Sequence, residues 1–267
     1  MENKKKKAVR VLILVGMAVC LIPVIREYGQ SRQHRAQQED LREIVSEASV
    51  QYPAQTNSAP QETIGPVLPE QAGEKPVMLA GYASLYKKNK DLAGWLSIKG
   101  MKIDYPVMQS GDDEYYLHHD FFGKDSKYGC LYVKKQADLD AGTNFIIYGH
   151  NMKDGSMFGD LDLYLKESFY KEHSTVSFDT LYEKRTYKIV AVFRSQVYNA
   201  DDDVFKYYQF YEADTQEEFK DFYRNIKKLS LYDTGVKAEF GDTFLTLSTC
   251  AYHVKDGRPV VVAKRIR

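Results

Sequence analysis

The residues most able to do chemistry lie between Thr246 and Lys264, in the segment TLSTCAYHVKDGRPVVVAK. The segment holds Cys250, one of only three cysteines in the chain, and Arg258 at the head of an apolar run. A cysteine is nucleophilic only as the thiolate, and a nearby cation favours that form. Cys250 can serve in packing, in a disulfide, as a metal ligand or as a nucleophile.

Cys250 ends a run of residues whose alternation is typical of a β-strand. A period of two gives one face with Phe244, Thr246, Ser248 and Cys250, and a second face with Leu245, Leu247 and Thr249. The leucine face is typical of a core, where a purely structural cysteine is more common. A cysteine at a strand end that opens a loop is displayed where reactive groups often lie.

Arg258 follows a turn signal, Asp256-Gly257, and begins the next apolar run. If the two runs pair as antiparallel neighbours, Arg258 lies opposite Cys250 at a Cα distance of about 5 Å. An arginine there lowers the pKa of a thiol or stabilises a developing oxyanion. Taken alone, an arginine at a strand start is more often a surface charge.

A reactive thiol also needs a proton partner, and the chain has six histidines. His150 stands at the tip of NFIIYGH, an apolar strand, so it can reach a second strand end on the same rim. His253 is closer to the cysteine in sequence, but it belongs to the polar loop and is the weaker candidate. A single strand-end histidine is usually a polar surface residue.

Metal and nucleic-acid functions are not favoured. The chain lacks CxxC and HExxH motifs, and the adjacent pair His118 and His119 points to opposite sides of an extended chain. The acidic run 201–203 lacks the alternating spacing of a calcium loop. Lys plus Arg and Asp plus Glu both total 37, so the zero net charge gives no reason to expect a nucleic-acid partner. We therefore expect no metal and no cofactor.

The N-terminus predicts a membrane anchor. Five positive charges precede or flank an uncharged run from Val11 to Ile25, and no small-x-small cleavage site follows it. We predict a cytoplasmic tail over 1–7 and an uncleaved signal anchor over 8–25, although the run is short of the ~20 residues typical of a spanning helix. The positive-inside rule then makes the protein single-pass, with the rest of the chain extracellular.

The region 26–77 is predicted to be a stalk or linker. Leu41, Ile44, Val45 and Ala48 recur at helical spacing within 30–50, which predicts a helix. The region 52–76 is rich in proline and predicts an extended linker.

The remaining residues, 78–267, are predicted to form one mainly β domain with peripheral helices. Short apolar runs alternate with turns, and Pro106 indicates an edge position for the run KIDYPVMQ. A helix begins near Asp214 or Thr215 and buries Phe219, Phe222, Tyr223 and Ile226. We expect a closed or nearly closed sheet, with Cys130 as buried packing rather than as a disulfide partner of Cys250.

The combination of motifs resembles the sortase family. The motif TLSTC, an arginine eight residues later and YGH about a hundred residues earlier are typical of sortases. The segments IDYPVMQ and YYLHHDF and the long helix before the last two strands resemble class B in particular. The likeness covers roughly 79–267 and implies an eight-stranded sortase-type β-barrel behind an N-terminal transmembrane helix.

The resemblance implies a cysteine transpeptidase of the Gram-positive cell surface. Cys250 is matched to the nucleophile, His150 to the general acid and base, and Arg258 to the oxyanion or substrate clamp. The enzyme is expected to cleave a C-terminal sorting signal after threonine and to hold the product as a thioacyl enzyme. The implied partners are surface proteins with a sorting signal, an amine of the cell-wall peptide, and the cell membrane.

The same resemblance implies a set of substrate-binding residues: Tyr148, Ser248, Thr249, Asp113 and Tyr207. Tyr148 stands two residues before His150, and Ser248 stands two residues before Cys250. Because side chains alternate with a period of two, this spacing independently places each on the same strand face as its matched catalytic residue. Asp113 stands where class B enzymes carry asparagine, and a looser alignment assigns Tyr207 and Tyr208 to the groove wall. Ala251 departs from the acidic or polar residue common after the nucleophile.

Two other classes of function remain open on the residues alone. One is another extracellular cysteine peptidase or a wall-crosslinking transpeptidase of different fold, although LSTC lacks the glycine typical of the latter before its cysteine. The other is a non-catalytic, membrane-tethered binding domain with an inert thiol. Reaction of Cys250 with a thiol probe separates the enzymes from the binding domain.

Overall fold

The computed structural model describes residues 2–51, 76–250 and 257–267, with side chains over 21–48, 76–249 and 257–267. The predicted linker over 52–76 lies almost wholly outside these residues, as does the loop 251–256. The described helices are α1 (Glu2–Gln51), α2 (Ala80–Lys88), α3 (Tyr115–His118), α4 (Glu167–Glu172) and α5 (Gln216–Leu229), with 3₁₀ turns η1 (Gly159–Leu165) and η2 (Tyr207–Gln209).

The described strands close into a barrel, which confirms the predicted mainly β fold. They are β1 (Leu92–Ser97), β2 (Asp104–Gln109), β3 (Leu131–Val133), β4 (Asn144–His150), β5 (Thr175–Thr180), β6 (Lys184–Ser195), β7 (Phe244–Cys250) and β8 (Arg258–Arg265). Their order around the barrel is β1-β2-β3-β4-β7-β8-β6-β5. Closure gives each of these described strands a neighbour on both sides.

The alternation of side chains along each strand produces two apolar layers. Leu245 and Leu247 of β7 belong to the layer that fills the barrel, to which all eight described strands contribute. Their neighbour Phe244 belongs to the second layer, between the outside of the barrel and the helices. The predicted leucine core face of β7 is confirmed, and the other face looks outward.

Helix α5 covers part of this outer face, as its sequence predicts. Thr215 is the N-cap, and its side chain and that of Glu218 form a reciprocal capping box. Phe219 and Phe222 are buried, and their ring centroids lie 5.3 and 5.5 Å from that of Phe244 in β7. The apolar stripe of the helix therefore attaches it to the strand that ends in Cys250.

The edge position predicted for Pro106 is wrong, because β2 pairs on both sides. Pro106 faces Trp95 of β1, whereas pairing with β3 begins only at Val107. The missing N–H of the proline therefore costs no hydrogen bond on the β3 side.

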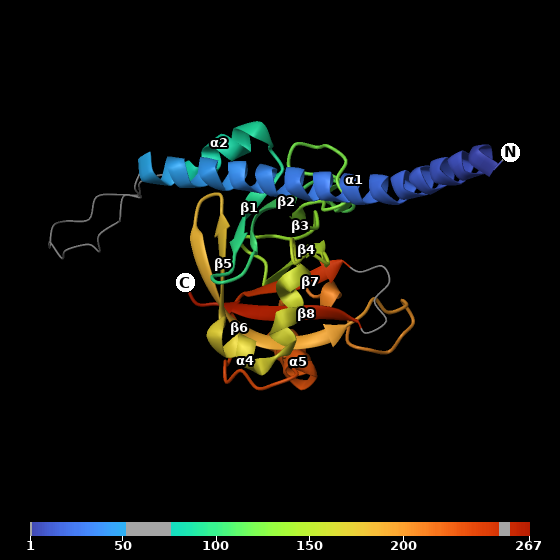
Figure 1. Cartoon of the computed structure of the whole chain (residues 1–267). Helices are drawn as coiled ribbons and strands as arrows, with labels where there is room; N and C mark the ends of the chain where they lie inside the picture. The colour runs from blue at the N-terminus through green and yellow to red at the C-terminus, as the bar shows by residue number, and fades with distance from the viewer. Residues whose placement is uncertain (1, 52–75, 251–256) are drawn as a thin grey trace, which may run out of the picture.

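The predicted helix over 30–50 is confirmed as part of α1, and it packs on the domain instead of standing apart from it. Figure 1 shows α1 (blue) lying across the barrel beside α2. Leu41 is fully buried, and the Arg42 guanidinium lies 3.0 Å from the Asp104 carboxylate of β2. In the part of the chain that the structure describes, we find no helix with the length and apolar character needed to cross a membrane.

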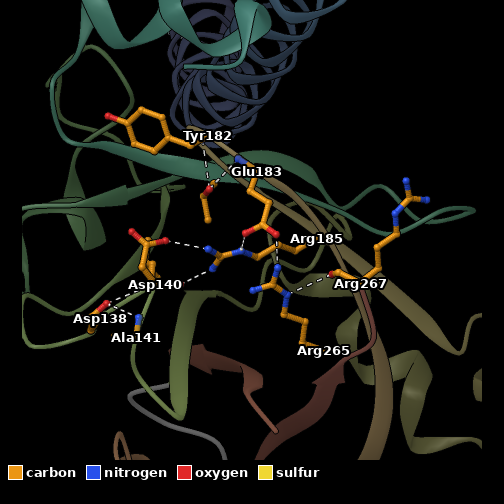
Figure 2. A network of polar contacts seen from close by, with 10 residues as sticks. Asp138, Asp140, Ala141, Tyr182, Glu183, Arg185, Arg265 and Arg267 are labelled. Carbon is orange, nitrogen blue, oxygen red and sulfur yellow. Dashed lines mark hydrogen bonds and ion pairs between the residues drawn. The ribbon is translucent and has the colours of Figure 1, made fainter. Parts of the chain in front are cut away.

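A polar network links strands and loops at one end of the barrel (Figure 2). The nearly buried Arg185 donates to Glu183 and to Asp140, at 2.8 Å each, and to the carbonyl of Leu139. Glu183 also accepts from Arg265 at the C-terminal end of β8. Since β8 runs from Arg258 to Arg265, this network lies at the end of β8 opposite Arg258.

His34 is the one buried histidine of the described chain, with 5% of its surface exposed. Its ring stacks on Tyr128 with the centroids 4.1 Å apart, and its Nε2 atom has no hydrogen-bond partner among the described residues. The pKa of His34 is lowered to about 4, chiefly because the ring is buried. The nearby carboxylates of Asp154 and Asp120 raise this pKa, and the nearby guanidinium groups of Arg42 and Arg35 lower it. Only the neutral imidazole is accommodated near neutral pH.

We expect His34 to make folding stability fall between about pH 6.5 and pH 4. In that window the unfolded chain binds a proton at His34 and the folded chain does not, so acid favours unfolding, by at most about 3 kcal/mol. The variant His34→Phe should flatten this part of the stability profile, measured by urea unfolding at pH 7.5 and pH 4.5. The exposed control His118→Gln should leave the profile unchanged, and a profile of His34→Phe identical to that of the wild type would contradict the assignment.

Candidate active site

The candidate site lies where three neighbouring strands meet one rim of the barrel. Strands β4 and β7 are parallel, and their register makes His150 and Cys250 direct Cα partners. Parallel neighbours end at the same edge of a sheet, so two residues a hundred positions apart share one rim. The sequence predicted this meeting, and the backbone register confirms it.

Arg258 joins the same rim from β8. The antiparallel register of β7 and β8 ends with Ser248 opposite Val260, and two further steps bring Cys250 across from Arg258. On its other side, Arg258 pairs with Ser195 of β6. The side chain of Cys250 and the residues Ala251 and His253 lie outside those described.

The imidazole of His150 is oriented by a backbone carbonyl. Its Nε2 atom lies 2.7 Å from the oxygen of Leu117, which belongs to α3. A carbonyl oxygen only accepts hydrogen bonds, so Nε2 must carry the hydrogen. In this tautomer Nδ1 carries no hydrogen, so it is the nitrogen that can accept a proton. The sequence contained no signal for this contact, because it is made by the main chain.

A groove of about 410 Å³ opens beside this rim. Three of the predicted site residues line it: Asp113, Tyr148 and Arg258. The remaining lining residues are Glu114, Leu117, Tyr132, Lys134, Val197 and Tyr208. The carbonyl partner of His150 and the candidate cation therefore border one space, large enough for several residues of an extended peptide.

Two stacked tyrosines form part of the groove wall. The rings of Tyr148 and Tyr132 lie 5.6 Å apart, and the Lys134 ammonium lies 5.7 Å from the centroid of the Tyr148 ring. Burial raises the pKa of Tyr148, and the neighbouring Tyr211 raises it further, so the phenol remains neutral. The Asp113 carboxylate accepts a hydrogen bond of 2.8 Å from the backbone N–H of Lys135, which fixes it in the groove.

Three of the residues predicted to bind substrate are buried and do not line the groove. Ser248 and Thr249 are fully buried, and Tyr207 is 2% exposed. The hydroxyls of Tyr207 and Ser248 share a hydrogen bond of 2.6 Å. The period of two gave the correct face for Ser248, but η2 covers that face at this point. Tyr208, the neighbour of Tyr207, lines the groove instead.

Cys130 is a free and buried thiol, as predicted. Burial raises its pKa, with a smaller contribution from Asp120, so it is held as the unreactive thiol. The side chains described contain no cluster of three or more His, Cys, Asp or Glu residues able to hold a metal ion. The chemistry that the rim offers is therefore that of a thiol, an imidazole and a guanidinium beside a peptide-sized groove.

Comparisons with known proteins agree with this geometry. The model of the sortase domain family matches residues 96–266. Sortase B of Listeria monocytogenes is 38% identical over 191 residues, which are 68% of this chain and 72% of the relative. A substrate complex of Staphylococcus aureus sortase B superposes with a TM-score of 0.73 at 27% identity, covering 89% of this chain and 98% of that one. A sortase B complexed with triglycine gives the same TM-score and identity, covering 89% and 99% of the two chains.

We expect the buried hydrogen bond between Tyr207 and Ser248 to stabilise the folded domain. Tyr207→Phe and Ser248→Ala should each lower the free energy of unfolding by about 1–3 kcal/mol, because each leaves a buried hydroxyl without this partner. Urea unfolding of the two variants and the double variant gives their coupling, expected near ~1 kcal/mol. Tyr182→Phe, at an exposed tyrosine, serves as the control, and strictly additive losses would argue against the bond.

Proposed function

The chain belongs to the class B sortases, which are cysteine transpeptidases, and from that premise we propose that Cys250, His150 and Arg258 carry out its reaction. The observation that supports this proposal best is the register of β4, β7 and β8, which brings the three residues to one rim. Each residue alone has an ordinary structural explanation, but their convergence beside a groove does not.

In the proposed reaction, Nδ1 of His150 takes the thiol proton of Cys250, and the resulting thiolate attacks the carbonyl carbon of the threonine in a sorting signal. The carbonyl electrons move to oxygen, and the Arg258 guanidinium stabilises that charge. When the C–N bond after the threonine breaks, the protonated imidazole of His150 gives its Nδ1 proton to the leaving amine. The product is a thioester between the substrate and Cys250.

An incoming amine then resolves the thioester. His150 accepts a proton from the amine as the new C–N bond forms, and the thiolate leaves. A thioester suits this two-step reaction because it reacts with amines more readily than with water. The triglycine complex of a related sortase B supports a peptide amine as acceptor. We propose a cell-wall peptide amine for this chain and surface proteins with C-terminal sorting signals as its substrates.

The substrate peptide is proposed to lie in the groove lined by Tyr148, Asp113 and Tyr208. Support comes from the volume of the groove and from its position beside the Leu117 carbonyl that holds His150. The tyrosine walls offer apolar contact area, while Asp113 and Lys134 offer polar contacts of both signs.

We also propose that the N-terminal segment 8–25 anchors the enzyme in the cell membrane, with tail 1–7 in the cytoplasm and the catalytic domain outside. The support is the uncharged run from Val11 to Ile25 and the lysine cluster that precedes it. Deletion of residues 8–25 should move the protein from the membrane to the soluble fraction of cells. Release of the full chain by alkaline carbonate, which removes peripheral proteins, would contradict a spanning anchor.

The catalytic assignment predicts a specific pattern among variants of the full chain. Cys250→Ala should abolish both cleavage of quenched sorting-signal peptides and the thioacyl adduct seen by intact mass. Arg258→Lys should lower kcat/KM by about 100- to 1000-fold, because a point charge replaces a planar fork of donors.

Cys130→Ala is the matched control, since it removes a thiol that is buried and unreactive. It should retain both the adduct and the turnover. A thioacyl adduct that persists in Cys250→Ala would overturn the assignment of the nucleophile. If no threonine-containing sorting peptide is cleaved, with or without an added amine, the proposed substrate class is overturned.

A further inference from the structure

We propose that α1 is a positioning element for the catalytic imidazole: it braces the segment 119–129, which fixes the carbonyl of Leu117 and thereby the tautomer of His150. The inference rests on the proposed catalytic role of His150. It gives the N-terminal helix a part in catalysis beyond its attachment to the domain.

The first step is the contact between α1 and the segment 119–129. Three residues on one face of α1 each hold one residue of the segment. Glu27 forms an ion pair with Lys127, His34 stacks on Tyr128 at 4.1 Å, and Gln37 donates from Nε2 to the Asp120 carboxylate at 2.9 Å. Their spacing of seven and three residues places them along one side of the helix.

Asp120 is well placed to receive such a brace. Its second carboxylate oxygen accepts the backbone N–H groups of Phe122 and Lys124, at 2.9 and 3.0 Å. Its own N–H donates to the Lys124 carbonyl at 2.8 Å. The turn that follows α3 is thus organised around one carboxylate, and Gln37 connects that carboxylate to α1.

The second step leads from the segment to the Leu117 carbonyl. Gly129, next to Tyr128, has a φ of +56°, and a Cβ atom there would lie 2.8 Å from the Leu117 oxygen and 2.4 Å from the Tyr116 oxygen. The main chain at 129 therefore backs directly onto the two carbonyls, which only glycine permits. Ser126 and Cys130 also donate backbone hydrogen bonds to His118 and Tyr116.

The third step is the bond from the Leu117 oxygen to His150 Nε2, at 2.7 Å. A displacement of this carbonyl by about 1 Å breaks the bond and leaves the imidazole free to carry its hydrogen on Nδ1 instead. In that tautomer Nδ1 already carries a hydrogen, so it cannot accept the proton that the proposed reaction requires. Misplacement on that scale typically costs up to about 100-fold in rate.

The contact with α1 also reaches the loop on the other side of His150. Phe158 donates its N–H to the His150 carbonyl at 2.9 Å, which closes the loop that contains Asp154. The Asp154 carboxylate accepts from Ser156 Oγ at 2.5 Å, and it lies 3.5 Å from Ser31 Oγ of α1. Helix α1 thus touches the segments before and after the imidazole.

The test uses the full chain and three substitutions on α1. Gln37→Glu replaces the donor to Asp120 with a second carboxylate, Gln37→Lys restores a donor, and Gln33→Glu makes the same charge change at an exposed glutamine one turn away. For Gln37→Glu we expect kcat for sorting-peptide cleavage to fall about 10- to 100-fold. KM should stay within about 2-fold, and Gln37→Lys and Gln33→Glu should remain near the wild type. If Gln37→Glu does not fold, Gln37→Ala replaces it.

The tautomer of His150 provides a second readout that does not need activity. Side-chain ¹⁵N shifts, assigned with His150→Gln, should show hydrogen on Nε2 in the wild type and a mixture of tautomers in Gln37→Glu. An unchanged tautomer in Gln37→Glu, with or without a loss of kcat, would overturn the inference. An inactive wild type would instead count against the proposed function, while the ¹⁵N shifts would still decide the positioning.

Discussion

The in-register parallel pairing of β4 and β7 is the constraint on which the rest of this structure depends. It joins His150 and Cys250 across a hundred residues of intervening chain, and parallel strands require such a crossover. The intervening chain forms two further strands of the barrel, β5 and β6, and the helix α5 that packs on β7. The site therefore depends on pairing between strands that are distant in sequence.

The strands of the site serve two purposes on their two faces. Toward the barrel interior, β4 and β7 present Phe145, Ile147, Leu245 and Leu247, which fix the strands by burial. Toward the outside, the same strands present Tyr148 and Ser248, and each is held by a different contact: Tyr132 stacks on the first, and Tyr207 bonds to the second. His150 ends β4 at the rim beside the groove, where a peptide can approach.

The two ends of the strands have opposite character. At the end of β8 away from the site, Arg185 and Arg265 share the carboxylate of Glu183, and Asp140 adds a further partner for Arg185. At the site, Arg258 borders an open groove. At one end arginine links strands and loops through carboxylates. At the other end, in the proposed reaction, Arg258 stabilises charge, because the groove makes that end accessible to substrate.

The amino-acid sequence by itself determined the motifs, the mainly β class, the helix 216–229 with its cap and the face of β7 that looks inward. These follow from local rules of spacing, capping and alternation, and the same rules place Cys250 opposite Arg258 if their strands pair as antiparallel neighbours. Only the tertiary structure decided that Tyr207 and Ser248 are buried while Tyr208 lines the groove, that Pro106 lies within a closed barrel, and that α1 packs on the domain. It alone revealed the Leu117 carbonyl at His150, because main-chain partners and covering elements are set by packing between distant segments and leave no signal in residue type.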